Sequence, residues 1–340
     1  MGIEATPRHA TLIVAPNWIG DCLMAQPLLM RLKAQGQHLT VLAPPAAAAV
    51  FRFMPEVDEV IEAPLAHGKL QWRMRRQLAR ELRKKFTRAY VLPNSLKSAL
   101  IPWLARIPVR VGYLGEQRYF LLNQIFRKEK SAERAPMLQH YAALAGVSDA
   151  SLPNPQLQIP ATLIEKTCAE FQLDRARPLI ALCPGAEYGP AKRWPAAYFA
   201  RLAELVSQAQ PQAQIILLGS AKDRAIAAEI CAATSTPPHN LCGKTTLAQA
   251  CALIAASNAV VSNDSGLMHI AAACARPQIA LFGSSDPRHT PPHSTQAKVE
   301  WLHLECSPCF ARECPLGHFR CMKELTPERV WGDLVLLLQG

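Results

Sequence analysis

The sequence predicts an α/β protein of two domains, each a parallel sheet with helices on both faces. Three observations support this prediction. Short apolar runs alternate with helical patterns through both halves of the chain. Prolines concentrate near the middle, where the alternation pauses. Several apolar runs end in polar turns that contain glycine and open a helix. Strands that alternate with helices favour a parallel sheet, and 340 residues fit about two domains.

The first half contains five predicted strands and three predicted helices. The strands are expected at residues 11–15, 39–42, 57–61, 89–92 and 109–112, and the helices at 21–34, 95–104 and within 69–88. The second half repeats this order, with strands expected at 179–182, 214–218, 259–262 and 278–281 and helices at 196–208, 221–232, 247–256 and 327–338. Both halves are Rossmann-like, and such sheets bind ligands at the carboxyl ends of their strands. That edge is expected to line a cleft between the two lobes.

The domain boundaries follow from the prolines at 153, 155 and 160 and from the polar stretch that ends at Arg177-Pro178. We expect a first Rossmann-like domain over 1–155, a linker over 156–177, a second Rossmann-like domain over 178–325 and a terminal helix over 326–340.

Composition excludes several classes of protein. Half of the residues are apolar and 19% are charged, as in ordinary globular proteins. No apolar run approaches the roughly 18 to 20 residues that span a bilayer. The first ten residues lack a signal pattern, so we expect a cytoplasmic protein. Eleven cysteines, an odd number, argue against a disulfide framework.

The net charge of +11 predicts an anionic partner. Much of the excess lies within residues 69–88, where nine cations accompany one acid and apolar residues recur every four positions. This amphipathic helix favours contact with an anionic membrane or a phosphorylated acceptor, through Arg73, Arg76, Arg80 and Lys84. The alternative is a helix packed on the core whose charged face is only solvated. No RNA-binding or helix-turn-helix signature accompanies it, so no specific nucleic acid is expected.

The polar turn Ser262-Asn263-Asp264-Ser265-Gly266 follows a predicted strand and opens a helix that contains Leu267 and His269. Free backbone N–H groups at a helix start bind anions, and glycine permits close approach of a ligand. The alternative role of Asp264 and Ser265 is capping of that helix.

Three further turns carry candidate chemistry. The turn 16–21 has one glycine, which disfavours a dinucleotide site, and its Asp21 is either a general base or a helix cap. The turn 183–195 offers Lys192 and Arg193 as a diphosphate clamp, unless these cations are only solvated. In the turn 219–223, Asp223 either binds a ribose or caps its helix.

Four cysteines lie within sixteen residues, at 306, 309, 314 and 321. Thiolates at this density bind Zn²⁺ or an iron–sulfur cluster. The spacing between Cys306 and Cys321 matches neither a common zinc ribbon nor a ferredoxin, so reduced thiols that shape a loop are the alternative.

The turns 16–21, 184–195, 219–223 and 263–269 occur in an order and spacing that resemble the bacterial lipopolysaccharide heptosyltransferases, glycosyltransferase family 9. This resemblance implies the GT-B fold, which consists of two Rossmann-like domains. It implies inverting transfer of L-glycero-D-manno-heptose from ADP-heptose to the first heptose of heptosyl-Kdo2-lipid A. It also implies a protein peripheral to the inner face of the cytoplasmic membrane that needs no cofactor or metal.

Matched residue by residue, the resemblance makes Asp21 the general base and Lys192 the ligand of the donor phosphates. On the donor side, the resemblance implies that Asp264 binds the sugar and that Asp223 lies near the ribose. It implies that His269 belongs to the same site. The diphosphate is expected to bind the backbone amides of Ser265, Gly266 and Leu267. Relatives that add the second heptose carry a similar cysteine-rich segment. The alternatives are transfer of the first or third heptose, a metal- or cluster-binding protein centred on the cysteines, and a nucleic-acid-binding module.

Overall fold

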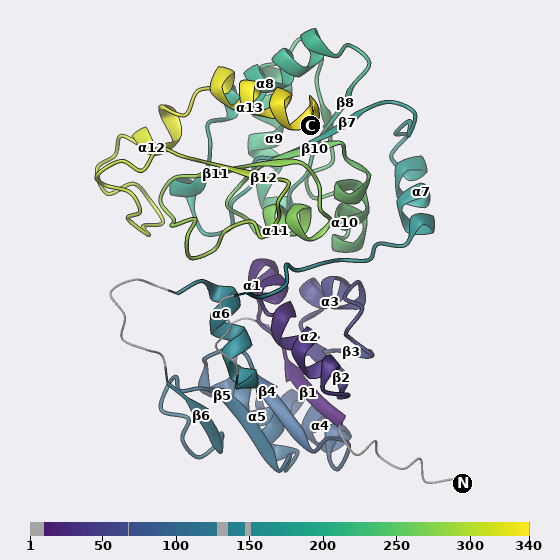
Figure 1. Ribbon diagram of the computed structural model, residues 1–340, viewed down its shortest axis with the longest axis vertical. Helices are drawn as coiled ribbons and strands as arrows, with labels where there is room; N and C mark the ends of the chain where they lie inside the picture. Colours follow the sequence, from purple (N-terminus) through teal and green to yellow (C-terminus); the bar gives the residue numbers. More distant parts are fainter. Residues whose placement is uncertain (1–9, 67, 128–134, 147–150, 340) are drawn as a thin grey trace. The chain divides into compact units, whose positions relative to one another are not determined.

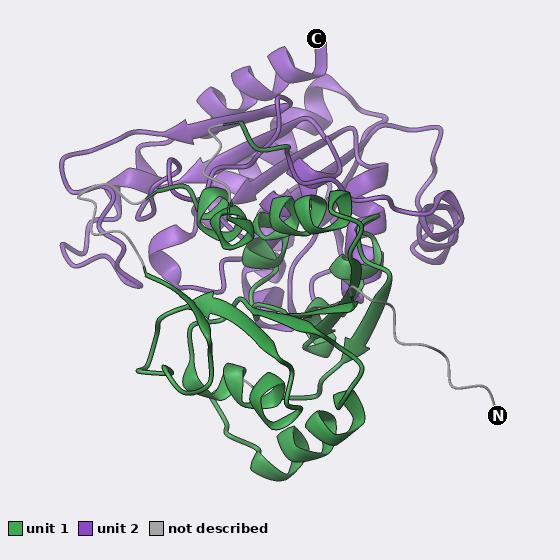
Figure 2. Cartoon of the chain, turned by 60° about the horizontal axis from the view of Figure 1, so that its bottom comes forward, with its two compact units in different colours: residues 1–153 green, residues 154–340 purple. Residues whose placement is uncertain are grey.

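The computed structural model describes residues 10–66, 68–127, 135–146 and 151–339. The chain divides into two compact units, Met1–Pro153 and Asn154–Gly340 (Figure 2). Each unit has its own six-stranded sheet and its own apolar core.

The sheet of the first unit has the strand order β3-β2-β1-β4-β5-β6, and every pair in it is parallel. Its strands are β1 (Ala10–Val14), β2 (His38–Ala43), β3 (Glu59–Glu62), β4 (Arg88–Val91), β5 (Val109–Tyr113) and β6 (Gln124–Phe126). The central strand β1 is buried throughout, as is typical of the inner strands of a parallel sheet.

The helices of this unit are α1 (Ile19–Met24), α2 (Gln26–Ala34), α3 (Pro45–Arg52), α4 (Trp72–Leu82), α5 (Leu96–Leu104) and α6 (Met137–Ala142), followed by the short 3₁₀ turn η1 (Ala143–Ala145). The prediction of one helix over 21–34 is wrong. The helix ends at Met24 and restarts at Gln26, with Pro27 in the first turn of α2. Proline has no N–H to donate to the preceding turn, so it is favoured in the first turn of a helix.

The sheet of the second unit repeats the topology of the first. Its order is β12-β11-β10-β7-β8-β9, again all parallel. The strands are β7 (Leu179–Cys183), β8 (Gln214–Leu217), β9 (His239–Asn240), β10 (Ala259–Asn263), β11 (Gln278–Phe282) and β12 (Ala297–Trp301). Counted from the first strand of each unit, both sheets have the order 3-2-1-4-5-6 of dinucleotide-binding folds.

The helices of the second unit are α7 (Ala161–Glu170), α8 (Ala196–Ala209), α9 (Arg224–Ala232), α10 (Leu247–Ala256), α11 (Gly266–Ala273), α12 (Arg320–Lys323) and α13 (Pro327–Gln339), with 3₁₀ turns η2 (Pro190–Lys192) and η3 (Ala221–Asp223). Helices α8 and α13 lie on one face of the sheet, and α10 and α11 lie on the other (Figure 1). No described helix is both long enough and apolar enough to cross a membrane.

The segment 156–177, expected to be a linker, contains helix α7. That helix packs against α10, where the Gln249 amide donates to the Glu170 carboxylate at 3.0 Å. The Leu157 N–H also donates to the Ala273 carbonyl at 2.9 Å. The contacts of this segment are therefore contacts within the second unit.

The topology explains where the polar turns gather. In each sheet the strand order reverses once, between β1 and β4 and between β7 and β10. The carboxyl ends of parallel strands meet at one edge, and a crevice forms there at the reversal point. The turns after β1, β7, β8, β10 and β11 all leave from such an edge.

Candidate functional site

Asp264 directly follows β10, and its carboxylate is almost fully buried. The Lys192 ammonium lies 2.5 Å from Asp264 Oδ2 and forms an ion pair with it. The Ser285 hydroxyl donates to the same oxygen, also at 2.5 Å. The structure thus joins two residues that the sequence placed in separate turns, and it adds a third that the sequence analysis missed.

Helix α11 begins next to this carboxylate, and no side chain caps it. Ser265 is the N-cap residue in extended conformation, but its hydroxyl contacts Ser262 Oγ at 3.2 Å and accepts no hydrogen bond from the helix. The capping alternative for Asp264 and Ser265 is therefore wrong. The first backbone N–H groups of an α-helix have no partner within the helix. Since no side chain caps α11, the N–H groups of its first turn, from Gly266 and Leu267 onward, are suited to bind an anion.

Asn263 connects this turn to the turn after β7. Its side-chain amide donates to the Pro184 carbonyl at 2.8 Å, and its side-chain oxygen accepts from the Trp194 backbone N–H at 3.1 Å. Trp194 is fully buried, and its indole N–H donates to the Leu325 carbonyl. The two ends of the Lys192 turn are thereby fixed to β10.

His269 lies one turn into α11 and is buried. Burial lowers the pKa of His269 to about 4, because the charged imidazolium is poorly solvated there; the nearby Asp264 carboxylate opposes the shift only in part. The imidazole is therefore neutral near pH 7 and adds no charge to the site.

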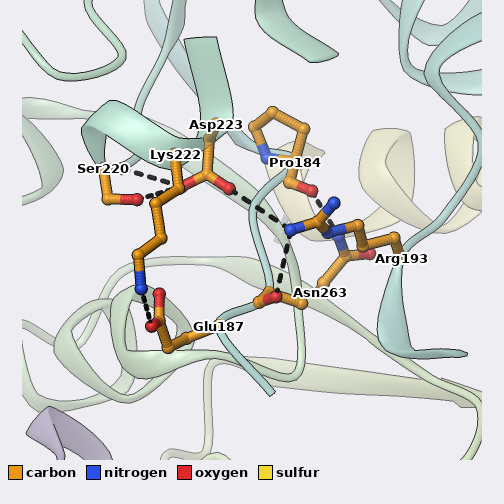
Figure 3. Close-up of polar contacts among 8 residues, drawn as sticks. Pro184, Glu187, Arg193, Ser220, Lys222, Asp223 and Asn263 are labelled. Atoms are coloured by element: carbon orange, nitrogen blue, oxygen red, sulfur yellow. Dashed lines mark hydrogen bonds and ion pairs between the residues drawn. The ribbon is translucent and has the colours of Figure 1, made fainter. Parts of the chain in front are cut away.

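Asp223 has the capping role that the sequence left open. Its carboxylate accepts from the Ser220 N–H and hydroxyl at 2.8 and 2.7 Å, which forms a capping box. Its other oxygen lies 4.0 Å from the Arg193 guanidinium (Figure 3). A Cβ on Gly185 would come within 2.6 Å of this carboxylate, so only glycine fits the adjoining turn. Lys222 points away from Asp223 and pairs with Glu187 (Figure 3).

Asp21 belongs to the first unit and is the third residue of α1, so it is not the helix cap; that position is Trp18. Burial raises the pKa of Asp21 to about 6, and a hydrogen bond with the Tyr141 side chain opposes the shift. Tyr141 comes from α6, far away in sequence. Among the described residues no cation forms an ion pair with Asp21. A carboxylate with a raised pKa is suited to accept a proton near neutral pH.

The basic helix is shorter than its sequence window. Arg73, Arg76 and Arg80 are exposed on α4, and Lys84 is exposed in the turn that follows it. Leu78, Leu82 and Phe86 of the apolar stripe are buried, whereas Leu70 is 51% exposed. Helix α4 therefore packs on the core, as the alternative interpretation expected, and still presents a cationic face to its surroundings.

The four cysteines of 306–321 are unpaired thiols that line one small pocket together with His318. Backbone N–H groups of residues 316–319 donate to the Cys314 sulfur and lower its pKa. Burial and the neighbouring thiols raise the pKa of Cys321 to about 11. In the described ranges no three His, Cys, Asp or Glu side chains are arranged to hold a metal ion.

Ser285 and Tyr141 were not predicted as site residues, and only Ser285 lies in a sequence pattern that could have identified it. Ser285 lies in Gly283-Ser284-Ser285-Asp286, a polar glycine-bearing turn after a predicted strand, which is the same pattern that identified the other turns. Tyr141 has no such pattern around it, because its contact depends on how α6 packs against α1.

Comparison with known proteins places this geometry in context. The sequence profile of glycosyltransferase family 9 (heptosyltransferase) matches residues 75–320. The chain is 44% identical to lipopolysaccharide heptosyltransferase 2 of Escherichia coli, over 96% of this chain and 98% of that protein. It is 43% identical to lipooligosaccharide heptosyltransferase 2 of Haemophilus influenzae, over 96% and 99%.

Among solved structures, ADP-heptose LPS heptosyltransferase II of E. coli is similar, with a TM-score of 0.85 and 40% identity over 97% of this chain and 98% of that chain. The predicted fold class, α/β of the GT-B type, is confirmed by this similarity.

Proposed function

Because the chain belongs to glycosyltransferase family 9 (heptosyltransferase), we propose that it transfers L-glycero-D-manno-heptose from ADP-heptose to the first heptose of the lipopolysaccharide inner core. The observation that carries the proposal is the Lys192–Asp264 ion pair beside the uncapped start of α11. It combines a cation, a buried carboxylate and free N–H groups at the reversal point of one sheet.

In this proposal the second unit binds the donor. The amides of Ser265, Gly266 and Leu267 and the Lys192 ammonium hold the diphosphate, since N–H groups at a helix start and a lysine both favour phosphate oxygens. Asp264, held by Lys192 and Ser285, accepts hydrogen bonds from hydroxyls of the heptose. His269 is a neutral hydrogen-bonding partner in the same site, and Asp223 lies on the ribose side.

Asp21 of the first unit is proposed as the general base. Its carboxylate takes the proton of the acceptor hydroxyl while that oxygen attacks the anomeric carbon from the face opposite the leaving group. The bond from this carbon to the diphosphate oxygen breaks, and ADP leaves with the electron pair. Lys192 and the α11 amides stabilise the developing charge. Attack opposite the leaving group inverts the anomeric centre.

The first unit is also proposed to bind heptosyl-Kdo2-lipid A. Arg73, Arg76, Arg80 and Lys84 form a cationic surface that suits an anionic glycolipid and the anionic inner face of the cytoplasmic membrane. The protein is accordingly proposed to act in the cytoplasm, peripherally associated with that membrane, with no specific nucleic-acid partner.

An acceptor-dependence assay tests the proposal. Purified protein should release ADP from ADP-heptose only when heptosyl-Kdo2-lipid A, or its deacylated core, is present. Kdo2-lipid A without heptose is the matched control. Activity on this control alone would assign the chain to transfer of the first heptose, and activity only on a diheptosyl acceptor would assign it to the third. No ADP release with any of these acceptors would contradict heptosyl transfer itself.

A further inference from the structure

The turns proposed to bind the donor diphosphate have no more cations than the carboxylates that face them. The turns 184–193 and 219–223 contain three cations, Lys192, Arg193 and Lys222. Each already faces a carboxylate: Asp264 at 2.5 Å, Asp223 at 4.0 Å and Glu187 in a close pair. His269 is neutral near pH 7 because burial lowers its pKa to about 4. These groups therefore sum to no net charge where a polyanion is to bind.

A further arginine reaches this place from a distant part of the sequence. Residues 302–319 form no helix or strand, and this segment docks on the turn after β7. Arg312 Nε donates to the Tyr188 carbonyl at 2.9 Å, and the Ala191 N–H donates to the Arg312 carbonyl at 3.0 Å. The Tyr188 hydroxyl in turn donates to the Phe310 carbonyl at 2.8 Å.

The contact between Arg312 and the turn after β7 is so close that it depends on a glycine. A Cβ on Gly189 would lie 2.4 Å from the Arg312 carbonyl oxygen, so the two backbones meet only because residue 189 has no side chain. This fixes the start of the Arg312 side chain relative to the turn that carries Lys192.

The Arg312 guanidinium and the Lys192 ammonium both lie over the ring of Tyr188. Arg312 Cζ is 5.4 Å from the centroid of the Tyr188 ring, and Lys192 Nζ is 5.3 Å from the same centroid. Arg312 is exposed, and none of the described carboxylates pairs with it. Its Nε is engaged by Tyr188, whereas its two terminal NH₂ groups have no hydrogen-bond partner within the described residues.

We propose that Arg312 is a second cation of the donor diphosphate site, where its terminal NH₂ groups bind phosphate oxygens beside Lys192. A planar guanidinium suits this role because it presents two parallel N–H donors to a phosphate. The inference rests on the proposed function, since it takes ADP-heptose as the donor. It also gives the cysteine-rich segment a function, which is to deliver Arg312.

The test compares ADP and adenosine binding by calorimetry for the intact chain and for Arg312→Gln, Arg312→Lys and Arg320→Gln. Arg320 belongs to the same part of the chain but is paired with Glu324, so its substitution is the matched control. Arg312→Gln should weaken ADP binding ten- to a hundredfold and leave adenosine binding unchanged, since a charge-assisted hydrogen bond contributes roughly 1.5–3 kcal/mol. Arg312→Lys should recover part of the loss, and Arg320→Gln should bind ADP as the unaltered chain does.

Two outcomes would overturn the inference. ADP affinity of Arg312→Gln within twofold of the unaltered chain would remove Arg312 from the site. Equal loss of ADP and adenosine binding would show that Arg312 only holds the turn in place. If the unaltered chain binds ADP and transfers heptose, either result rejects the role of Arg312 alone; if it binds no ADP, the proposed function fails as well.

Discussion

Asp21 and Asp264 each lie after a strand that borders the reversal point of a 3-2-1-4-5-6 sheet, but their surroundings differ. Asp264 has a lysine ammonium and a serine hydroxyl within 2.5 Å. Asp21 accepts a hydrogen bond from the Tyr141 hydroxyl, and burial raises its pKa to about 6. The same topology thus supports two kinds of carboxylate. A carboxylate held by a cation and a hydroxyl is suited to binding, whereas a desolvated one exchanges a proton near neutral pH.

The largest expected effect comes from Asp21→Asn. If Asp21 is the base, turnover should fall by about 10²- to 10⁴-fold, because the amide cannot accept the proton. ADP affinity should be unchanged, since the residues proposed to bind the donor all belong to the other unit. Asp58→Asn, which alters a carboxylate of the first unit paired with Lys33, is the control and should retain activity. If turnover by Asp21→Asn stays within tenfold of that of the unaltered enzyme, Asp21 is not the general base.

Lys192→Met is expected to lower kcat by about 10²-fold. The departing diphosphate loses a cation that matters most as charge develops on it. The measurement is single-turnover ADP release at saturating donor, which separates the chemical step from binding. Loss confined to the KM for ADP-heptose, with kcat preserved, would assign Lys192 to ground-state binding only.

The free energy of unfolding should change in opposite directions when the two carboxylates are replaced. The folded-state pKa of Asp21 lies above its unfolded value of 3.8, so the stability contributed by the protonated form is lost as the pH rises from about 4 to 6. At pH 7.5 Asp21→Asn should therefore stabilise the fold, by on the order of 1–3 kcal/mol.

Asp264→Asn should instead destabilise by roughly 2 kcal/mol, because it leaves the Lys192 ammonium without its counterion in a buried place. Denaturant unfolding at pH 7.5 measures both changes. Two shifts of the same sign would show that the two carboxylates do not differ as described.

Neutralising the cationic face of α4 tests which unit meets the acceptor. The triple variant Arg73→Gln, Arg76→Gln and Arg80→Gln should raise the KM for the acceptor about tenfold, since each surface cation contributes at most about 1 kcal/mol toward an anionic membrane. The KM for ADP-heptose should not change. An equal rise in both constants would contradict separate binding by the two units.

The smallest expected effect is on pH dependence. With a base whose pKa is about 6, kcat/KM should fall about tenfold per pH unit below that value. The hydrogen bond from Tyr141 lowers the pKa of Asp21, so Tyr141→Phe should shift this acid limb to higher pH. At pH 6 that amounts to a loss of a few-fold, which disappears at pH 8. A limb that stays in place would mean that another group sets it.

The sequence predicts local features better than distant contacts. Buried strands such as β1 and β10 are continuous apolar runs, and their turns contain the glycines and carboxylates that mark a ligand site. Strand β12 is not predictable in this way because it lies at the sheet edge, where polar residues interrupt the apolar run. Strand β6 is also an edge strand, and its three residues are too few to show a pattern.

The residues of the candidate site also differ in whether local sequence patterns identify them. Asp264 and Lys192 were identified from their own turns, each of which follows a strand and opens a helix. Tyr141 and Arg312 were not identified, because they reach the site through packing between segments that are far apart along the chain. Sequence periodicity and motif spacing do not predict such packing, so these residues can be identified only from the three-dimensional structure.

The missing side chain at Gly189 has a consequence for protein engineering. Because the Arg312 carbonyl occupies the space that a methyl group would need, residues 302–319 and the turn after β7 act as a single exchangeable module. A chimera that swaps the cysteine-rich segment between relatives but keeps a host turn with alanine at this position should misassemble. Transplanting the segment together with the turn after β7 should preserve the contact between them.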